Sequence, residues 1–436
     1  MSERVSILIR SSARLELADA LQAVIGQTHR NLDVVIVNVT GRPHPPLPAE
    51  ASALSVTLVD RGRQLPRPQA ANAALDAVTG DHALFLDDDD LLEPDHVAVC
   101  VAAVRADRTR LPFTGSQICG EEGELHAVWP ARAFGRLEIV ERIRLQPSAA
   151  LIPRAVIAEG FRFDPDLPIF EDWDFWIRMS RRIPFRPLPA NTAVCRLALG
   201  TSGTGVGANF DLERTARESH PFHAKWEPER LALTATFEQL SAAADSALSA
   251  GEFDRAEALC KEAHALKIWD VPILSRLARV FEARNDMERA RRFATAAGRA
   301  RLLAPLPLTR DALTRLHAHL QQGNASALAG DTARAEFEFN NALLLHDGDQ
   351  TACNGLANLR ILQRRLAEAE ELLRQGTLWG DRVYPTLLLK RGGLLEQLGR
   401  RNDARELYRQ LARLVPRYAP ATDRLRALDA IESAAA

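Results

Sequence analysis

LFLDDDDLLEPDHV, residues 84–97, joins an apolar run, typical of a buried strand, to four consecutive aspartates, Asp87 to Asp90. Two unit charges about 4 Å apart repel each other by roughly 1 kcal/mol in bulk water, and more strongly in a partly dry cleft. Either water surrounds these carboxylates or a cation lies among them. The simpler alternative is a solvated acidic turn before a helix that begins near Pro94.

Four short apolar, largely β-branched runs precede or border the aspartates, at residues 5–9, 33–39, 55–59 and 82–86. Segments with apolar residues at helical spacing separate the first run from the second and the third from the fourth. Such alternation predicts a mostly parallel sheet with helices on both faces. Ligands of these sheets bind beyond the carboxyl ends of the strands, and the aspartates fall at such an end.

Length and composition describe an ordinary globular protein of two or three domains. The chain has 436 residues, 46% hydrophobic and 26% charged, and a formal net charge of −2. Nothing here indicates binding to nucleic acid or to a membrane. Five scattered cysteines without a CxxC pair fit reduced thiols. No secretory signal or transmembrane segment is apparent, so we expect a cytoplasmic protein.

Beyond residue 230 an internal helical repeat replaces the β-branched runs. Five copies align on a Gly or polar residue that is followed, mostly by Ala, at offsets of +5 and +12. The first residues of the copies are Gly251, Asn285, Gly330, Arg364 and Gly399. The steps of 34, 45, 34 and 35 residues predict stacked helical hairpins, with an insertion around residues 305–311. A generic helical bundle whose alanines merely pack is the alternative.

This repeat resembles the tetratricopeptide repeat. Gly392, Pro416, Phe339 and Tyr408 also fall on that family's pattern. The resemblance implies an all-α, TPR-like solenoid with a concave face for peptides or proteins. We therefore expect a domain at residues 1–220, a linker at 221–236 and a helical repeat domain at 237–436.

The first half contains four motifs in a defined order. They are VSILIRSS, LQAVIGQTHRNLDVVIVNV, AANAALDAVTGDHALFLDDDDLLEPDHV and QPSAALIPRAVIAEGFRFDPDLPIFEDWDFWIRMS. In this order they resemble family 2 glycosyltransferases of the GT-A fold, over residues 3–200. The resemblance implies an α/β, Rossmann-like GT-A domain with a mostly parallel sheet, which transfers a sugar from a nucleoside-diphosphate sugar.

The resemblance assigns a divalent metal, Mn²⁺ or Mg²⁺, to the aspartates. Asp87 and Asp89 lie two apart in an extended segment and so project to one side, as a DxD motif requires. Asp89 is the best metal ligand, with Asp87 contacting ribose or metal and Asp90 as a substitute. Asp88 is expected beside the donor, as an outer contact or a spectator. A hard cation held by carboxylates neutralises a leaving diphosphate.

The acids Glu171 and Asp172 open a helix. Carboxylates are favoured in a first turn, so helix capping alone would explain them. The resemblance places the catalytic base on the second acid, Asp172, which would take the proton from an acceptor hydroxyl. One carboxylate suffices for a single inverting displacement, whereas a retaining double displacement also needs a nucleophile. We expect Trp176 in the core, and Trp173 either in the core or in a sugar platform.

Three departures from the family affect the nucleotide pocket. The family's Pro-Thr-Tyr is RSS at residues 10–12, so an aromatic ring is lost and a cation, Arg10, is gained. Asn38 replaces the uracil-binding Asp, although an amide can still pair with an imide edge. Ala71 replaces an Arg, but Arg67, one helical turn earlier, can reach the diphosphate. The residues expected around a donor such as a UDP-sugar are Ser11, Asn38, Arg67, Asp87 and Asp88.

The segment GTSGTGVGANF, residues 200–210, is rich in glycine. Its backbone donors suit a phosphate, but it lacks the Lys-Ser/Thr ending of a P-loop. A lid over the donor and a simple linker are the other interpretations.

Two functions from different classes follow. The first is a metal-dependent, inverting glycosyltransferase whose helical repeats recruit a protein or glycan acceptor. Joining a peptide-binding solenoid to a transferase raises the effective concentration of a protein acceptor at the active site. The second is a non-catalytic scaffold that uses the repeats for protein binding.

Overall fold

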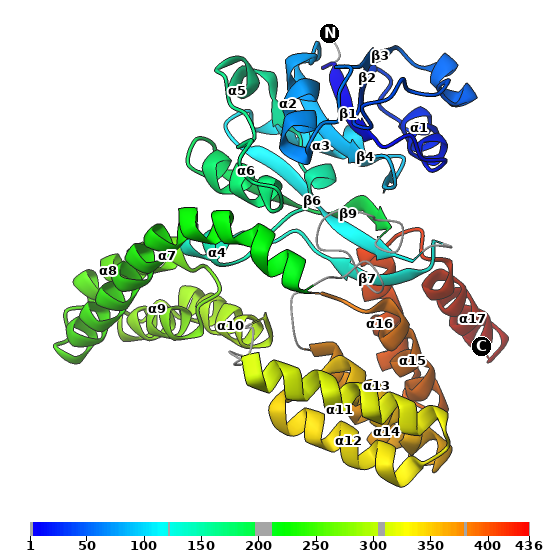
Figure 1. Cartoon of the computed structure of the whole chain (residues 1–436). Coiled ribbons are helices and arrows are strands. Elements are labelled where there is room, and N and C mark those ends of the chain that lie inside the picture. Colours follow the sequence, from blue (N-terminus) through cyan, green and yellow to red (C-terminus); the bar gives the residue numbers. More distant parts are fainter. Residues whose placement is uncertain (1–2, 121–122, 197–211, 304–309, 379–381, 436) are drawn as a thin grey trace. The chain divides into compact units, whose positions relative to one another are not determined.

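The computed structural model describes residues 3–120, 123–196, 212–303, 310–378 and 382–435. The chain forms two compact units, residues 1–125, 129–268 and 272–293 in the first and residues 126–128, 269–271 and 294–436 in the second. Strands and short helices precede helix α7 (Leu212–Ser249), and every regular element from α7 onward in the described residues is an α-helix (Figure 1). The predicted α/β domain followed by an all-α region is therefore confirmed.

The strands form two sheets. Their bounds are β1 (Val5–Ser11), β2 (Leu32–Asn38), β3 (Val56–Val59), β4 (His82–Asp87), β5 (Leu91–Leu92), β6 (Leu111–Cys119), β7 (Leu125–Trp129), β8 (Ile152–Pro153) and β9 (Phe185–Arg196). The five-stranded sheet has the order β3-β2-β1-β4-β8, and only β8 is antiparallel to its neighbour. The four-stranded sheet has the order β5-β9-β6-β7, with β6 and β9 parallel. The four predicted strands are thus β1 to β4, the parallel strands of the larger sheet.

Helices cover both faces of the five-stranded sheet because its strands send alternate side chains to opposite sides. The helices and 3₁₀ turns before α7 are α1 (Leu17–Ile25), η1 (Ala49–Ala53), α2 (Arg67–Asp76), α3 (His96–Ala106), α4 (Arg136–Glu141), η2 (Pro147–Ala149), α5 (Arg154–Ala158) and α6 (Glu171–Ser180). Val34 and Ile36 of β2 pack in one core cluster with residues of α1 and α3. Val35 and Val37 pack in the other, with residues of α2 and α6.

The segment 221–236, expected as a linker, lies inside α7. Phe222, Trp226 and Leu233 are buried at helical spacing and belong to the same core cluster as Trp173. This apolar stripe explains why the helix continues through two prolines, each of which removes a backbone donor. The segment is therefore a packed helix and not a free linker. The domain boundaries drawn on either side of it stay a prediction.

Helical hairpins make up the rest of the chain, and their turns occur at the predicted repeat positions. The helices are α8 (Phe253–Leu266), α9 (Val271–Ala283), α10 (Met287–Leu303), α11 (Arg310–Leu328), α12 (Thr332–Leu345), α13 (Gln350–Leu362), α14 (Leu366–Leu378), α15 (Pro385–Gln397), α16 (Arg401–Leu414) and α17 (Ala419–Ala435). The five aligned turn residues all have a left-handed backbone, with φ of +75° at Gly251, +58° at Asn285, +80° at Gly330, +57° at Arg364 and +76° at Gly399. Such a backbone favours glycine, which explains why three of the five are Gly.

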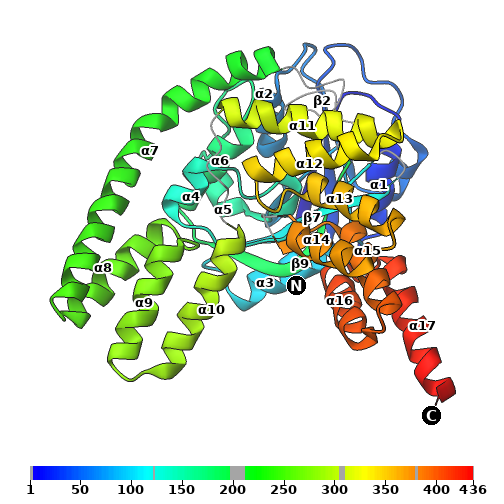
Figure 2. The same ribbon diagram turned by 90° about the horizontal axis from the view of Figure 1, so that it is seen from below.

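Small residues let the helices of each hairpin approach closely. The five alanines at offset +5 are at most 1% exposed: Ala256, Ala290, Ala335, Ala369 and Ala404. Two glycines, Gly323 and Gly355, lie against the ring of Phe339, where a Cβ atom would overlap it, and Gly392 lies likewise against Tyr408. Successive helices from α11 to α17 contact one another in chain order, and Figure 2 shows α11, α12 and α13 side by side.

The repeats' membership of the tetratricopeptide family stays a prediction. The insertion expected at residues 305–311 falls largely outside the described residues. The flanking helices α10 and α11 have 17 and 19 residues, whereas α12 to α16 have 13 or 14. Part of the extra length of that repeat is therefore helical.

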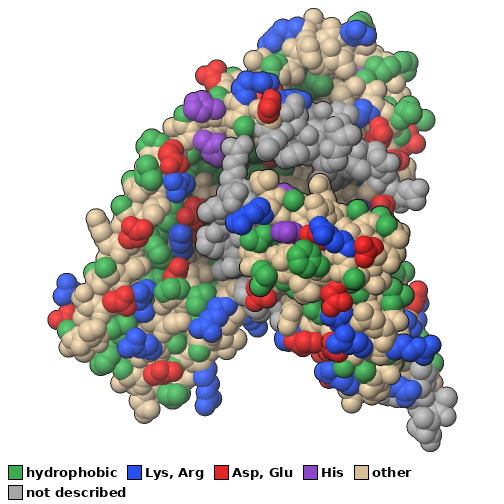
Figure 3. All heavy atoms as spheres, turned by 60° about the horizontal axis from the view of Figure 1, so that its bottom comes forward, with side chains coloured by type: hydrophobic (Ala, Val, Ile, Leu, Met, Phe, Trp, Pro, Cys, Tyr) green, Lys and Arg blue, Asp and Glu red, His purple; other side chains and the backbone are tan. Residues whose placement is uncertain are grey.

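The surface carries charges of both signs. On the face seen in Figure 3, the Lys and Arg side chains of the described residues alternate with Asp and Glu and do not gather by sign. This agrees with the near-neutral net charge of −2. Among the helices that the structure describes, none is both long and apolar enough to cross a membrane.

Candidate active site

The polar residues predicted from the sequence meet at the carboxyl ends of three neighbouring parallel strands. In the register of the sheet, Ser11 at the end of β1 pairs with Asn38 at the end of β2. Arg10 pairs on the other side with Asp87, the last residue of β4. In sheets of this kind ligands bind beyond the carboxyl ends of the strands. The side chains at the ends of β1, β2 and β4 lie together in that region.

Three of the four aspartates converge. Asp87, Asp89 and Asp90 each offer a carboxylate oxygen, and these oxygens lie within 4.8 Å of one another. Burial, together with the charges of Asp87 and Asp89, raises the pKa of Asp90 to about 8. Three convergent carboxylates are a donor set that fits a hard divalent cation. Asp90, predicted only as a substitute ligand, thus lies in one cluster with Asp87 and Asp89, the two ligands predicted from the DxD pattern.

Asp88 faces a different partner. Its carboxylate accepts hydrogen bonds from the backbone N–H of Ser12 (2.6 Å) and from the Ser12 hydroxyl (2.9 Å), and the residue is 4% exposed. It therefore fastens the loop after β1 to the acidic segment. This position suits the predicted outer contact better than a direct one to the donor.

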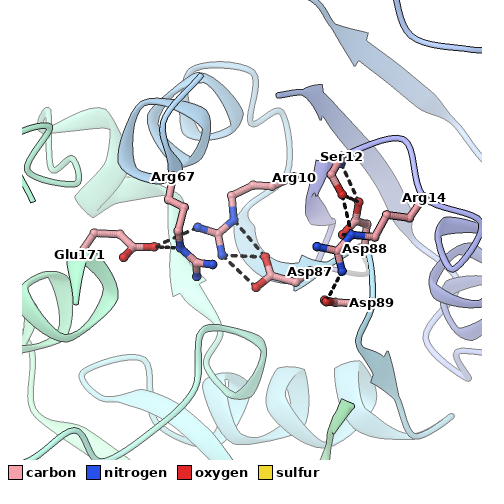
Figure 4. A network of polar contacts seen from close by, with 8 residues as sticks. All are labelled: Arg10, Ser12, Arg14, Arg67, Asp87, Asp88, Asp89 and Glu171. Carbon is pink, nitrogen blue, oxygen red and sulfur yellow. Dashed lines mark hydrogen bonds and ion pairs between the residues drawn. The ribbon is translucent and has the colours of Figure 1, made fainter. Parts of the chain in front are cut away.

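Two arginines already neutralise two of the aspartates (Figure 4). Arg10 donates to both oxygens of Asp87, from Nη2 at 2.6 and 2.9 Å and from Nε at 2.9 Å. Arg14 donates from Nη1 to Asp89 at 2.6 Å. Burial disfavours the charge on Asp87, but Arg10 and Arg67 lower its pKa below the ordinary value. Asp87 is therefore held ionised by basic side chains.

Arg10 also connects the aspartates to the start of α6. Its Nη1 donates to Glu171 at 3.1 Å, and Nε of Arg67 donates to the same Glu171 oxygen at 2.8 Å. Burial opposes the charge on Glu171, yet Arg67 and Arg10 lower its pKa. Asp87, Arg10, Glu171 and Arg67 thus form one continuous ionic network.

Asp172, the predicted base, faces a cavity of about 370 Å³. The lining includes Arg67, Phe170, Glu171 and Trp173. Burial and the charge of Glu171 raise the pKa of Asp172 to about 6, while Arg67 and the N–H of Trp173, which donates at 2.8 Å, act in the opposite direction. A carboxylate of this pKa is mostly ionised at neutral pH and is a better proton acceptor than an exposed Asp.

The comparisons with known proteins agree with this arrangement. Residues 12–140 match the sequence profile described as Glycosyl transferase family 2. Residues 12–140 therefore belong to a family 2 glycosyltransferase domain. A Bacillus subtilis (strain 168) relative, the uncharacterized glycosyltransferase YwdF, is 22% identical over 218 residues, which cover 48% of this chain and 80% of YwdF.

Solved structures that this chain matches include S. aureus TarS. TarS 1-349 in complex with UDP-GlcNAc has a TM-score of 0.39 and 12% identity, covering 70% of this chain and 95% of that one. A longer TarS structure has a TM-score of 0.36 and 12% identity, and this chain spans about half of it (54%). The family profile, and not these distant structures, identifies the glycosyltransferase domain.

The side chains predicted to contact the nucleotide have hydrogen-bond partners within the chain. The amide of Asn38 donates to the Arg42 carbonyl (2.6 Å) and to Asp60 (2.8 Å), and its oxygen accepts from the N–H and hydroxyl of Thr40 (3.0 and 2.8 Å). Asn38 therefore shapes its own loop and positions Asp60. Bonds from the N–H of Gly62 and from Asn38 lower the pKa of the exposed Asp60.

Other predicted residues find local partners. The hydroxyl of Ser11 lies 2.9 Å from Nε2 of His44, and it accepts from the N–H of Ala13 at 3.1 Å. Ala71 is fully buried in the core, so no polar side chain could act from there. Trp176 is in the core as expected, at 1% exposure. Trp173 is 9% exposed and donates from its indole to the Ile139 carbonyl at 2.5 Å, although it also lines the cavity.

Sequence reasoning missed the roles of Arg14, Glu171, Arg196 and Asp60. Arg196 at the end of β9 donates its backbone N–H to Asp90 at 3.0 Å, and its Nε to the Asp89 carbonyl at 2.5 Å. No spacing signal predicts these contacts, because they join segments far apart in the chain. The Gly-rich segment 200–210, predicted as a phosphate cradle, lid or linker, lies outside the described residues.

Proposed function

We propose that this chain is a metal-dependent glycosyltransferase that moves a sugar from a nucleoside-diphosphate sugar to an acceptor hydroxyl with inversion. One observation carries the proposal. An ionic network through Arg10 joins the cluster of convergent carboxylates to Glu171, and the half-buried Asp172, whose pKa is raised, is the next residue in the chain. Separate acidic turns would need no such connection.

Asp87, Asp89 and Asp90 would hold the cation, Mn²⁺ or Mg²⁺. Bound there, it would supply the positive charge that stabilises a leaving diphosphate. Arg67 and Arg10 stand next to this position and would add donors for phosphate oxygens. A UDP-sugar is the donor proposed first, with the GDP- and dTDP-sugars as alternatives.

Asp172 would act as the general base. It would take the proton from the acceptor hydroxyl as that oxygen bonds to the anomeric carbon and the bond from that carbon to the diphosphate oxygen breaks. Attack from the face opposite the leaving group inverts the anomeric configuration. A single displacement needs one such carboxylate, and Asp172 would supply it from the lining of the cavity.

The helical hairpins would recruit the acceptor, a protein or a glycan. Their regular stacking and small-residue packing are typical of repeat proteins that bind other chains. A cytoplasmic location and a tetratricopeptide identity belong to this proposal.

A non-catalytic scaffold is the second candidate. Two observations favour it. Arg10 and Arg14 already pair with Asp87 and Asp89, and the side-chain amide of Asn38 already donates hydrogen bonds within the chain. A degenerate domain that only supports the hairpins would tolerate both.

One assay separates the two candidates. The full chain is incubated with Mn²⁺ and a panel of UDP-, GDP- and dTDP-sugars, and nucleotide release is measured for the wild type, Asp89→Ala and Asp172→Asn. Catalysis predicts release by the wild type with one donor and none by either variant. Nucleotide binding should weaken only in Asp89→Ala. A wild type that neither binds nor hydrolyses any donor leaves the scaffold.

A further inference from the structure

We propose that Arg10 and Arg14 are built-in counter-ions that occupy Asp87 and Asp89 until a divalent cation and a nucleoside diphosphate arrive together. The consequence is that metal and nucleotide bind jointly, each weakly without the other. This inference rests on the proposed function and adds an order of binding to it. It is specific to this chain, because Arg10 stands where the family resemblance gives a neutral residue.

The contacts of the two arginines occupy the carboxylate oxygens that a cation would use. Arg10 takes both oxygens of Asp87. Arg14 takes an oxygen of Asp89, while its Nε donates to the Ser12 hydroxyl at 2.7 Å. Both side chains are largely shielded from solvent, with 8% of Arg10 and 17% of Arg14 exposed. These are charge-assisted contacts in a partly dry site and are stronger than surface ion pairs.

A cation that arrives alone must displace these guanidinium groups and leave them without their anions. Leaving a buried charge unpaired is costly, so the displacement opposes metal binding. A diphosphate changes the balance, because its oxygens accept bidentate bonds from the displaced arginines. The cation and the diphosphate also largely cancel each other's charge. Because the charges of this site are already paired, it binds the cation and the diphosphate together more readily than it binds either of them alone.

The two arginines differ in how freely they can move. Arg10 stays attached to Glu171 through Nη1, so it can turn from Asp87 toward a phosphate without losing every partner. Arg14 lies in the loop after β1, which the hydrogen bond between Asp88 and Ser12 holds in place. Its side chain is the more exposed of the two. Arg14 is accordingly the better residue to change, since Arg10 also supports the network around Glu171.

The test measures binding and not activity. MnCl₂ is titrated into the full-length wild type and Arg14→Gln by calorimetry. UDP is then titrated with and without Mn²⁺, with GDP and dTDP used if UDP does not bind. Removing the competitor should tighten the binding of Mn²⁺ alone by about 10-fold, within the range usual for coupled sites. The factor by which Mn²⁺ improves nucleotide affinity should be at least about 10 in the wild type and smaller in Arg14→Gln.

Arg182→Gln is the matched control. Arg182 is exposed and pairs with Glu159, away from the aspartates, so its loss changes the net charge equally. It should leave the Mn²⁺ affinity of the wild type unchanged. Arg14→Lys keeps the charge but not the fork of donors and should give an intermediate affinity, which provides a second test if Arg14→Gln folds poorly.

The outcomes distinguish this inference from the function on which it rests. Equal Mn²⁺ affinities in the wild type and in both Arg14 variants, with nucleotide binding still dependent on Mn²⁺, would overturn the counter-ion role and leave the metal-dependent transferase intact. If Mn²⁺ bound to neither the wild type nor the Arg14 variants, whichever nucleotide was present, the proposed metal dependence would be refuted. The counter-ion role would be refuted with it.

Discussion

The substitution Asp172→Asn is expected to abolish sugar transfer and, at the same time, to stabilise the protein. Asp172 is a half-buried carboxylate beside the charge of Glu171, and desolvation and this charge raise its pKa to about 6. In the proposed mechanism its ionised form is the base, and ionising this group costs more free energy in the folded state than in the unfolded chain. The amide of Asn carries no charge, and its oxygen can still accept the Trp173 N–H.

The size of the effect follows from the pKa difference. A free Asp titrates near 3.9, so the folded state shifts this group by about two pKa units, or about 3 kcal/mol at most. Since the native state binds the proton more tightly, the stability of the wild type falls as the pH rises from about 4 to about 6, and the full penalty is present above that range. The uncharged amide of the Asp172→Asn variant removes the penalty. Each kcal/mol changes the melting temperature by about 2–4 °C in a domain of this size.

Thermal unfolding of the full chain at pH 5 and pH 8 measures this difference. Asp172→Asn should melt several degrees above the wild type at pH 8 and closer to it at pH 5. Asp166→Asn, at an exposed position, is the charge-matched control and should differ from the wild type at neither pH. In the transfer assay, kcat of Asp172→Asn should fall by about 100-fold or more. If the Asp172→Asn variant were active, or if its melting temperature at pH 8 equalled that of the wild type, the assignment of Asp172 as a base of raised pKa would be refuted.

Three further predictions concern the base, the metal site and the repeats. Arg67→Gln removes a charge that lowers the pKa of Asp172, so the acid limb of kcat/KM should move to higher pH, which a pH-rate profile measures. Asp89→Asn should weaken Mn²⁺-dependent nucleotide binding by about 10-fold or more, whereas Asp88→Ala should mainly lower the melting temperature, because it leaves the two donors of Ser12 without this acceptor at a cost of about 1–3 kcal/mol. In α15, a Cβ at Gly392 would overlap a buried tyrosine ring while one at Gly393 has space, so Gly393→Ala should stabilise the helix by about 0.5–1 kcal/mol and Gly392→Ala should destabilise it. Equal melting temperatures for the two alanine variants would contradict this packing.

The sheet and the hairpins could be predicted because each leaves a short-range pattern in the sequence. Parallel strands buried on both faces appear as continuous apolar runs, and β1, β2 and β4 have this form. Hairpins stacked at a fixed step repeat their turn residue and their small packing residues, even where the turn residue is Arg364. The segment 221–236, predicted as a linker and helical in the structure, is the opposite case. Its prolines and charges suggest a break, while the apolar stripe that keeps it helical consists of widely spaced residues.

The candidate site could be predicted only in part, because strand topology fixes its edge but not its pairings. The acids after β4 and at the start of α6 follow from motif and topology. The contact of Arg10 with Glu171 joins residues 161 positions apart and depends on packing between α6 and the sheet. The role of Asn38 did have a local signal. Thr40, two residues further on, bonds back to its side chain in the manner of an Asx turn, which competes with any ligand for that amide.

The ionic network also helps to decide between a catalytic domain and a non-catalytic scaffold. Glu171 is 1% exposed and Arg10 is 9% exposed, and charges in such places lose much of their hydration. Replacing a buried ionic network by apolar residues is often neutral or stabilising by about 1–4 kcal/mol. A domain that served only to support the hairpins would gain from that replacement and would have no need of Asp172 with its raised pKa. The presence of both features in one connected site is therefore better explained by catalysis than by support.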